Sequence, residues 1–119
     1  MSANPVADLL GHIRQAAVDA RSYVEGLSKN DFLADKRTQQ ATVMNLVIIG
    51  EAASKFMDYH AEFVQRHPEV PWRAMRGMRN RIAHGYFDID IDVVWNTVQQ
   101  DLQPLLEKLP ASNYPGTGP

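Results

Sequence analysis

Residues 41–56 read ATVMNLVIIGEAASKF and contain the longest apolar run of the chain. Positions 43–49 are apolar on nearly every side of a helix, which is typical of a buried, central helix. Gly50 and the alanines that follow it would let a second helix approach closely. A β-strand is the competing interpretation of 43–49, but helix-forming residues flank the run and no turn residues lie beside it. We therefore predict a long central helix from about residue 35 towards residue 60.

The segment before this helix also has helical periodicity. In residues 6–27, apolar side chains recur at alternating steps of four and three, which predicts one continuous apolar stripe on a helix. The stripe consists of Val6, Leu10, Ile13, Ala17, Ala20, Val24 and Leu27. Residues 28–35 should hold a turn and one short helical piece, because Ser28, Asn30 and Asp31 are good capping residues.

Prolines divide the second half of the chain. Pro68 and Pro71 break it after the central helix, and Pro71 suits the first turn of a third helix that should end near Gly85. The apolar side of that helix carries Trp72, Met75, Met78 and Ile82. A fourth helix should follow the aspartates in 88–92, and Pro104 should kink it or end its first part. Its stripe is Ile91, Val94, Val98, Leu102, Leu105 and Leu109. Four helical stretches predict an all-α bundle.

The composition fits a single domain. The chain has 119 residues, 45% of them hydrophobic, and no cysteine, which excludes disulfides, thiolate metal sites and a cysteine nucleophile. The first six residues lack a basic stretch followed by an apolar run, and no apolar run is long enough to span a bilayer. We therefore expect a cytoplasmic protein without membrane contact, with its domain in residues 1–109 and a disordered tail in 110–119.

The charge of the chain is concentrated in one segment. Its net charge is −2, so any contact with RNA must come from a local patch. Four arginines, Arg73, Arg76, Arg79 and Arg81, fall within nine residues. Arg73, Arg76 and Arg81 either steer RNA towards a cleft or form ion pairs on a solvated helix face.

Arg79 and His84, with Asn80 beside the arginine and Tyr86 two residues after the histidine, suffice for RNA cleavage without a metal. A guanidinium group binds phosphate oxygens, and an imidazole exchanges a proton near neutral pH. The RNA 2′-hydroxyl attacks the adjacent phosphorus once a base removes its proton, and a fixed arginine stabilises the charge that builds on the phosphoryl oxygens. In the alternative, structural interpretation, Arg79 pairs with a carboxylate and His84 caps a helix C-terminus.

Helix geometry restricts how these two residues can meet. At about 100° per residue, Arg79 and His84 would lie roughly 140° apart on an unbroken helix and would not converge on one phosphate. Either the helix ends before His84, as Gly85 favours, or a second chain completes the site. We expect both, with two copies of the segment lining one cleft across a homodimer.

Residues 71–88, PWRAMRGMRNRIAHGYFD, closely resemble the HepT family of toxins in the HEPN superfamily. The segments QQA at 39–41, IIGEA at 48–52, DID at 90–92 and VW at 94–95 resemble it too, in the same order and spacing. The resemblance covers about residues 6–109, and it is specific because several segments agree in order and spacing.

The resemblance implies a HEPN-type bundle of four or five helices that forms a homodimer with a composite cleft. It also implies metal-independent endoribonuclease activity without a cofactor, on RNA and not on DNA. The Arg-x4-His pair of the family corresponds to Arg79 and His84, its polar residue after the arginine to Asn80, and its His-x-Tyr to Tyr86.

The resemblance further implies a partner, an MntA-like minimal nucleotidyltransferase. In a type VII-like toxin–antitoxin system, this antitoxin would silence the toxin by attaching AMP to Tyr86. A bulky anion there would block the cleft by its volume and repel RNA phosphates by its charge. The alternative function is a dimeric interaction module that binds a nucleotidyltransferase or nucleic acid without cleaving anything.

Overall fold

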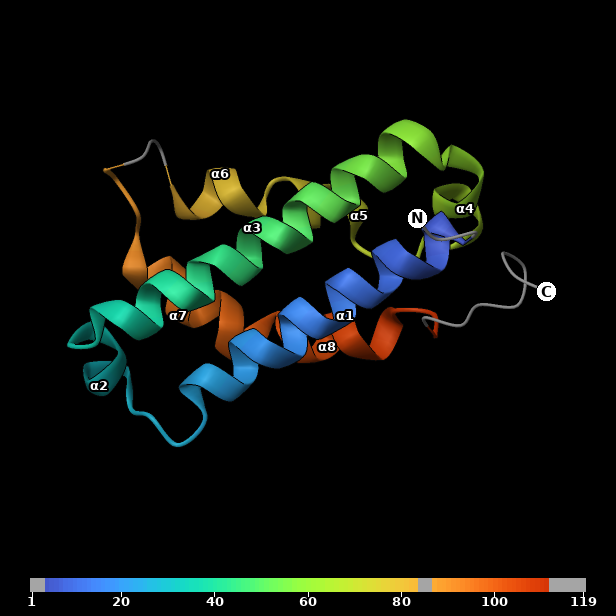
Figure 1. Cartoon of the computed structure of the whole chain (residues 1–119). Coiled ribbons are helices and arrows are strands. Elements are labelled where there is room, and N and C mark those ends of the chain that lie inside the picture. Colours follow the sequence, from blue (N-terminus) through green and yellow to red (C-terminus); the bar gives the residue numbers. More distant parts are fainter. Residues whose placement is uncertain (1–3, 84–86, 112–119) are drawn as a thin grey trace.

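The structure is a computed structural model that describes residues 4–83 and 87–111. It is all-helical in these ranges, which confirms the predicted fold class (Figure 1). The helices are α1 (Pro5–Val24), α2 (Lys29–Leu33), α3 (Lys36–Tyr59), α4 (Ala61–Arg66), α5 (Trp72–Arg76), α6 (Met78–Ile82), α7 (Ile91–Gln100) and α8 (Leu102–Lys108). None of these helices is both long and apolar enough to cross a membrane.

The two longest helices, α1 and α3, lie side by side and run in opposite directions (Figure 1). The predicted stripe of α1 is buried from Val6 to Val24. The helix ends at Val24, however, so its predicted end at Leu27 is wrong. Glu25 leaves the helical conformation with ψ of 128°, and Gly26 makes the turn that follows, because its φ of +79° lies in the left-handed region that glycine adopts readily.

Side-chain caps fix the beginnings of α2 and α3 where the sequence predicts them. Ser28 and Asp31 form a capping box at the start of α2. Asp35 accepts a hydrogen bond of 3.1 Å from the backbone N–H of Thr38 at the start of α3. The Thr38 hydroxyl also donates to Asp35, and these hydrogen bonds hold the pKa of the Asp35 carboxyl below its usual value.

The helix α3 contacts most of the other helices, as expected for the central helix, but it is buried on one side only although residues 43–49 are apolar on nearly every side. Leu46 and Ile49 are fully buried, whereas Met44 is 59% exposed and Ile48 is 37% exposed. The buried side contacts α1, α5 and α6, whereas Met44 and Ile48 lie on the side that is partly exposed. An apolar run marks helical structure, but it does not say how many neighbours the helix has.

The third and fourth predicted stretches are each interrupted. The third divides at Gly77 into α5 and α6 and ends at Ile82, three residues before the predicted end. The fourth divides at Asp101 into α7 and α8, because the ring nitrogen of Pro104 has no hydrogen to donate to the preceding turn. This division confirms the expected effect of Pro104.

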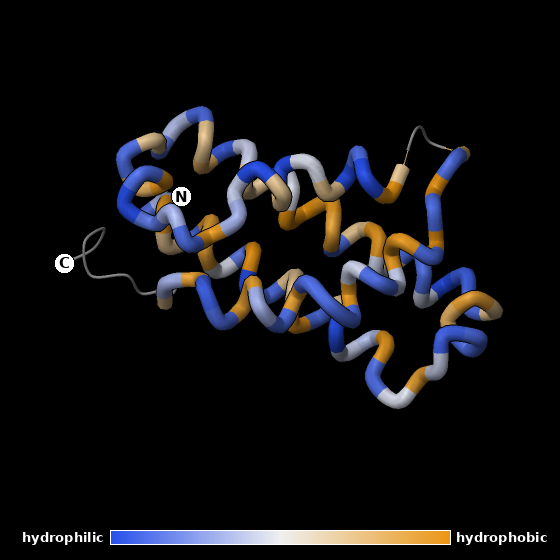
Figure 2. Tube along the Cα trace, turned by 180° about the vertical axis from the view of Figure 1, so that it is seen from behind, coloured by the Kyte–Doolittle hydropathy of each residue, from blue (hydrophilic) through white to orange (hydrophobic). Residues whose placement is uncertain are grey.

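The short helix α4 was not predicted. It places Phe63 against Phe56 of α3, with ring centroids 5.3 Å apart, and Trp72 of α5 lies 4.8 Å from the same Phe56 ring. The Trp72 indole N–H donates to the His67 carbonyl at 3.0 Å, which ties the loop before α5 to this cluster. Hydrophobic positions recur along every long helix and build one continuous core (Figure 2).

Candidate active site

Helices α5 and α6 lie across α3 and carry the predicted arginines. Their buried side chains are those of the predicted stripe, Trp72, Met75, Met78 and Ile82. A Cβ atom at Gly50 of α3 would lie 3.1 Å from the Met75 carbonyl oxygen. The absence of a side chain at Gly50 therefore allows the close approach that the sequence predicts, and α5 packs directly on the backbone of α3.

The polar residues of α5 and α6 point away from this packing. Because the apolar stripe faces α3, the remaining positions of these short helices face solvent. Arg73, Arg76, Arg79, Asn80 and Arg81 are all exposed. Residues 73–81 therefore expose four arginine side chains on an otherwise acidic chain.

Ion pairs divide the four arginines into two groups. Arg76 binds Asp58 at 2.8 Å, and Arg81 lies 3.7 Å from Asp101. Within residues 4–83 and 87–111, Arg73 and Arg79 form no ion pair. The ion-pair interpretation therefore holds for Arg76 and Arg81, while the guanidinium groups of Arg73 and Arg79 remain open to a ligand on the described part of the chain.

The helix that carries Arg79 ends before His84, as one of the two geometric alternatives requires. Ala83 is extended, with φ of −147° and ψ of 129°, and it pairs with Ile89 in an antiparallel bridge. The backbone N–H of Asp90 donates to the Ile82 carbonyl at 2.7 Å, and the Asp90 side chain caps α7. Both ends of the segment between Ala83 and Ile89 are thus anchored to helices.

Three residues of that segment, His84, Gly85 and Tyr86, lie outside the described residues. The predicted proton-transfer residue and the predicted modification site therefore stay predictions. What the described residues contribute is Arg79 and Asn80, exposed on the last turns before the chain leaves the helix.

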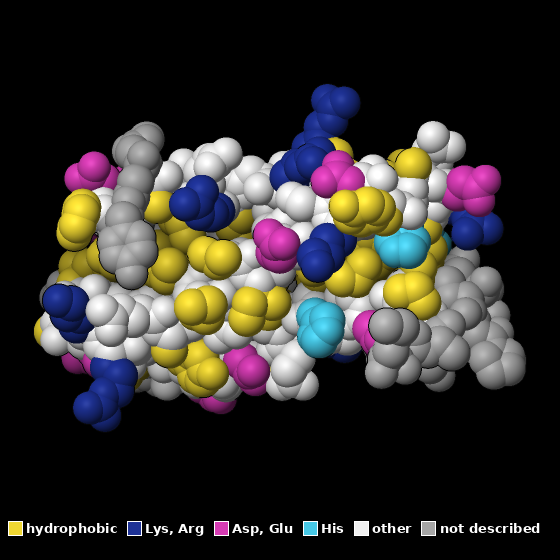
Figure 3. Space-filling view, turned by 45° about the horizontal axis from the view of Figure 1, so that its top comes forward, with side chains coloured by type: hydrophobic (Ala, Val, Ile, Leu, Met, Phe, Trp, Pro, Cys, Tyr) yellow, Lys and Arg dark blue, Asp and Glu magenta, His cyan; other side chains and the backbone are white. Residues whose placement is uncertain are grey.

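A shallow groove lies on the surface where α1 packs against α3. It has a volume of about 450 Å³ and is lined by Leu9, His12, Val47, Ile48, Glu51, Ala52 and Lys55. Figure 3 shows hydrophobic side chains gathered along the middle of this face, with charged side chains around them. Sequence analysis missed this exposed apolar surface, because periodicity gave no sign of which side of the central helix is uncovered.

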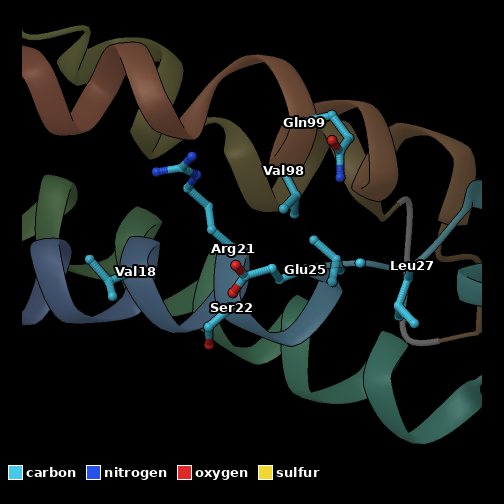
Figure 4. Close-up of a pocket in the computed structure, with 9 residues that line it drawn as sticks. Val18, Arg21, Ser22, Glu25, Leu27, Val98 and Gln99 are labelled. Carbon is cyan, nitrogen blue, oxygen red and sulfur yellow. The ribbon is translucent and has the colours of Figure 1, made fainter.

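A second hollow lies between the end of α1 and α7 (Figure 4). Its volume is about 460 Å³, and it contains none of the predicted site residues. Arg21 at its edge donates a hydrogen bond to the Gln103 side chain. In the described part of the chain, no group of three or more His, Asp or Glu side chains is placed to hold a metal ion.

Comparison with known proteins gives consistent matches over most of the chain. The family model described as Ribonuclease HepT-like matches residues 13–111. A protein named probable ribonuclease HepT from Thermococcus cleftensis is 39% identical over 101 residues, which are 85% of this chain and 89% of that protein. No solved structure matches the chain significantly.

Two further relatives have names of the same kind. A putative RNase from Caldanaerobacter subterraneus subsp. tengcongensis is 36% identical over 83% of this chain and 85% of its own length. A putative RNase from Methanocaldococcus jannaschii is 30% identical over 90% of this chain and 89% of its own length.

Proposed function

Because the chain belongs to the HepT-like ribonuclease family, we propose that it is a metal-independent endoribonuclease toxin that acts on cytoplasmic RNA through Arg79 and His84. The observation that carries this proposal is the placement of Arg79. Its guanidinium group is exposed, it has no ion pair within the described residues, and it lies one turn before the point where α6 ends. A cation held in this way is available to a phosphate.

In the proposed reaction, His84 removes the proton from the 2′-hydroxyl of the substrate. The 2′-oxygen forms a bond to the adjacent phosphorus, and the bond from phosphorus to the 5′-oxygen breaks. The products are a 2′,3′-cyclic phosphate and a free 5′-hydroxyl, whose oxygen takes up a proton from a protonated histidine or from water. Arg79 stabilises the negative charge on the phosphoryl oxygens, and Asn80 supports the same group by hydrogen bonding.

We propose that the working unit is a homodimer with a composite cleft. The apolar face of α3 supports this, because Met44 and Ile48 expose large hydrophobic side chains on the helix that carries α5 and α6. A two-fold contact through this face would bring together two copies of the segment that begins at Arg79. It would also remove these side chains from water.

The other arginines take different roles in this proposal. Arg73 has no ion pair within the described residues and is the best candidate for steering RNA. Arg76 and Arg81 are held by Asp58 and Asp101, so they are expected to contribute less to RNA affinity and more to the local structure.

Regulation would act on Tyr86. We propose that an MntA-like nucleotidyltransferase antitoxin, in a type VII-like toxin–antitoxin system, transfers AMP from ATP to the Tyr86 hydroxyl with release of pyrophosphate. Co-expression with that partner should raise the intact mass of the chain by AMP units, and Tyr86→Phe should abolish the shift. A shift of the same size in Tyr86→Phe would place the modification elsewhere.

RNA cleavage in the presence of a chelator tests the central proposal. The purified, unmodified protein should cleave, and Arg79→Ala and His84→Ala should each lose activity by at least about 100-fold, as is typical for loss of a general base or a charge-stabilising group. Arg66→Ala, which removes an exposed arginine from α4, is the matched control and should keep full activity.

The alternative, a non-catalytic module that binds a nucleotidyltransferase or nucleic acid, makes the opposite prediction. Wild-type protein and His84→Ala would then leave RNA equally intact while still binding their partner. That result would refute the enzyme proposal.

A further inference from the structure

We propose that Asp90 is a positioning residue for the candidate active site, because it fixes the backbone that leads into His84. This inference rests on the proposed ribonuclease function. Asp90 has no contact with RNA in this proposal. It acts through its hydrogen bond to the Ile82 carbonyl, at the end of the helix that carries Arg79.

Asp90 connects α6 and α7 through two different groups. Its backbone N–H donates to the Ile82 carbonyl at 2.7 Å, and its side chain accepts a hydrogen bond of 3.2 Å from the Val93 N–H as the N-cap of α7. The Asp90 backbone is extended, with φ of −85° and ψ of 98°. A side-chain cap stabilises such a non-helical conformation at the first residue of a helix. The cap therefore keeps the N–H of the same residue directed at Ile82.

The start of α7 is itself attached to the core. Asp92 binds Lys29 of α2 at 2.9 Å, and the Trp95 ring lies on the fully buried Phe32 ring with centroids 5.3 Å apart. The ring contact is the stronger restraint, because the ion pair is exposed. Helices α2 and α7 contact each other at one end of the molecule (Figure 1). Since Ile82 is also fully buried, the hydrogen bond to its carbonyl connects two fixed points of the fold.

The effect on His84 follows from its covalent neighbour. His84 is bonded to Ala83, which is extended and paired with Ile89 directly beside this hydrogen bond. Loss of the hydrogen bond would free Ala83 to take other backbone conformations. A displacement of about 1 Å in a reacting group costs on the order of 100-fold in rate, so kcat should fall. Arg79 lies within α6 itself and keeps its place, so KM should change little.

The test compares kcat and KM of wild type, Asp90→Ala and Asp90→Asn on a short single-stranded RNA over a range of pH. Alanine removes the cap, whereas asparagine caps a helix as well as aspartate does but carries no charge. We expect Asp90→Ala to lower kcat about tenfold or more with an unchanged KM. Asp90→Asn should keep the wild-type kcat and the wild-type pH profile.

Asp35→Ala is the matched control. Asp35 caps α3 with a bond of the same kind, 3.1 Å from the Thr38 N–H, and it lies outside the proposed site. This variant and Asp90→Ala should lose similar amounts of thermal stability, because each loses one N-cap. Only Asp90→Ala should lose activity, so a general effect of stability is separated from positioning.

Amide hydrogen exchange tests the connection without a substrate. The protection factor of the amide at residue 90 should be similar in wild type and Asp90→Asn. It should fall about fivefold or more in Asp90→Ala, as expected when one hydrogen bond is weakened. Amides in the middle of α1 and α3 should keep their protection.

Four results would overturn the inference while the ribonuclease proposal stands. They are full activity in Asp90→Ala, an equal loss of kcat in Asp35→Ala, unchanged amide protection in Asp90→Ala, and a loss of kcat in Asp90→Asn. The last result would mean that the carboxylate acts through its charge and not through the cap. A wild-type protein that cleaves no RNA would refute the ribonuclease proposal and this inference together.

Discussion

Replacement of Ile48 by glutamate tests whether the exposed face of α3 is a dimer interface. Full burial of a large aliphatic side chain is worth about 1.5–3 kcal/mol. Because Met44 is 59% exposed and Ile48 is 37% exposed, covering both is worth about 2 kcal/mol per chain, or about 4 kcal/mol across a two-fold contact.

Ile48 contributes about 1.7 kcal/mol of this from the two chains together. Two new carboxylates in an apolar contact add at least as much again, because each must lose water without gaining a partner. The dissociation constant of the dimer should therefore rise about 100-fold or more, since 1.4 kcal/mol corresponds to a factor of ten.

Sedimentation velocity across a concentration series measures this change, and RNA cleavage at the same concentrations tests its consequence. Val18→Glu is the control, because Val18 is 46% exposed on α1 and lies outside the groove between α1 and α3. Its side chain also lies half a turn away from that of Leu9, which lines the groove. Circular dichroism should show both variants folded.

A dimer that survives Ile48→Glu, or that dissociates equally with Val18→Glu, would refute this assignment of the interface. A monomer that cleaves RNA at the wild-type rate would refute the composite site.

The described contacts support three further predictions. Arg73→Ala should weaken RNA binding and reduce the salt dependence of the affinity, whereas Arg81→Ala should change both quantities less. Salt titrations of RNA affinity measure both effects. Equal effects of the two substitutions would show that the contact with Asp101 does not keep Arg81 from binding RNA. Gly50→Ala should lower the free energy of unfolding by about 1 kcal/mol in urea titrations, because overpacking against the Met75 carbonyl outweighs the gain in helix propensity. A stabilised variant would mean that α5 can shift away from α3 at little cost. The pKa of the Asp35 carboxyl is lower in the folded state than in the unfolded state, so its hydrogen bonds stabilise the fold at pH values above the unfolded-state pKa, and this stability is lost as pH falls through the folded-state pKa. Asp35→Asn should therefore flatten the acid side of the curve of melting temperature against pH. A curve parallel to that of the wild type would exclude this contribution.

Much of the candidate site could be predicted from the sequence, because its local structure depends on nearby residues. The apolar stripe Trp72, Met75, Met78 and Ile82 predicts which side of the segment is buried, and so predicts that Arg79 and Asn80 face solvent. What the sequence left open was whether the helix continues to His84. The bridge between Ala83 and Ile89 ends it at Ile82, and a pairing of that kind has no periodic pattern to reveal it.

The partners of the arginines could not be predicted at all. Arg76 meets Asp58 and Arg81 meets Asp101 only because α3 and the α7–α8 junction pack beside α5 and α6. The separations in the sequence are 18 and 20 residues, so no local rule connects the members of either pair. The exposed ring of Phe87 is another case, because a sequence shows a phenylalanine but not its surroundings.

The sequence by itself determined the helices, their caps and the proline breaks, because these depend on interactions within a few residues of the chain. Asp35, Asp90 and Pro104 act where the sequence predicts them for this reason. Only the tertiary structure decided which side of the central helix stays uncovered. Burial depends on what packs against a residue, and the run at 43–49 would look the same in a fully enclosed helix and in one that leaves Met44 and Ile48 in water.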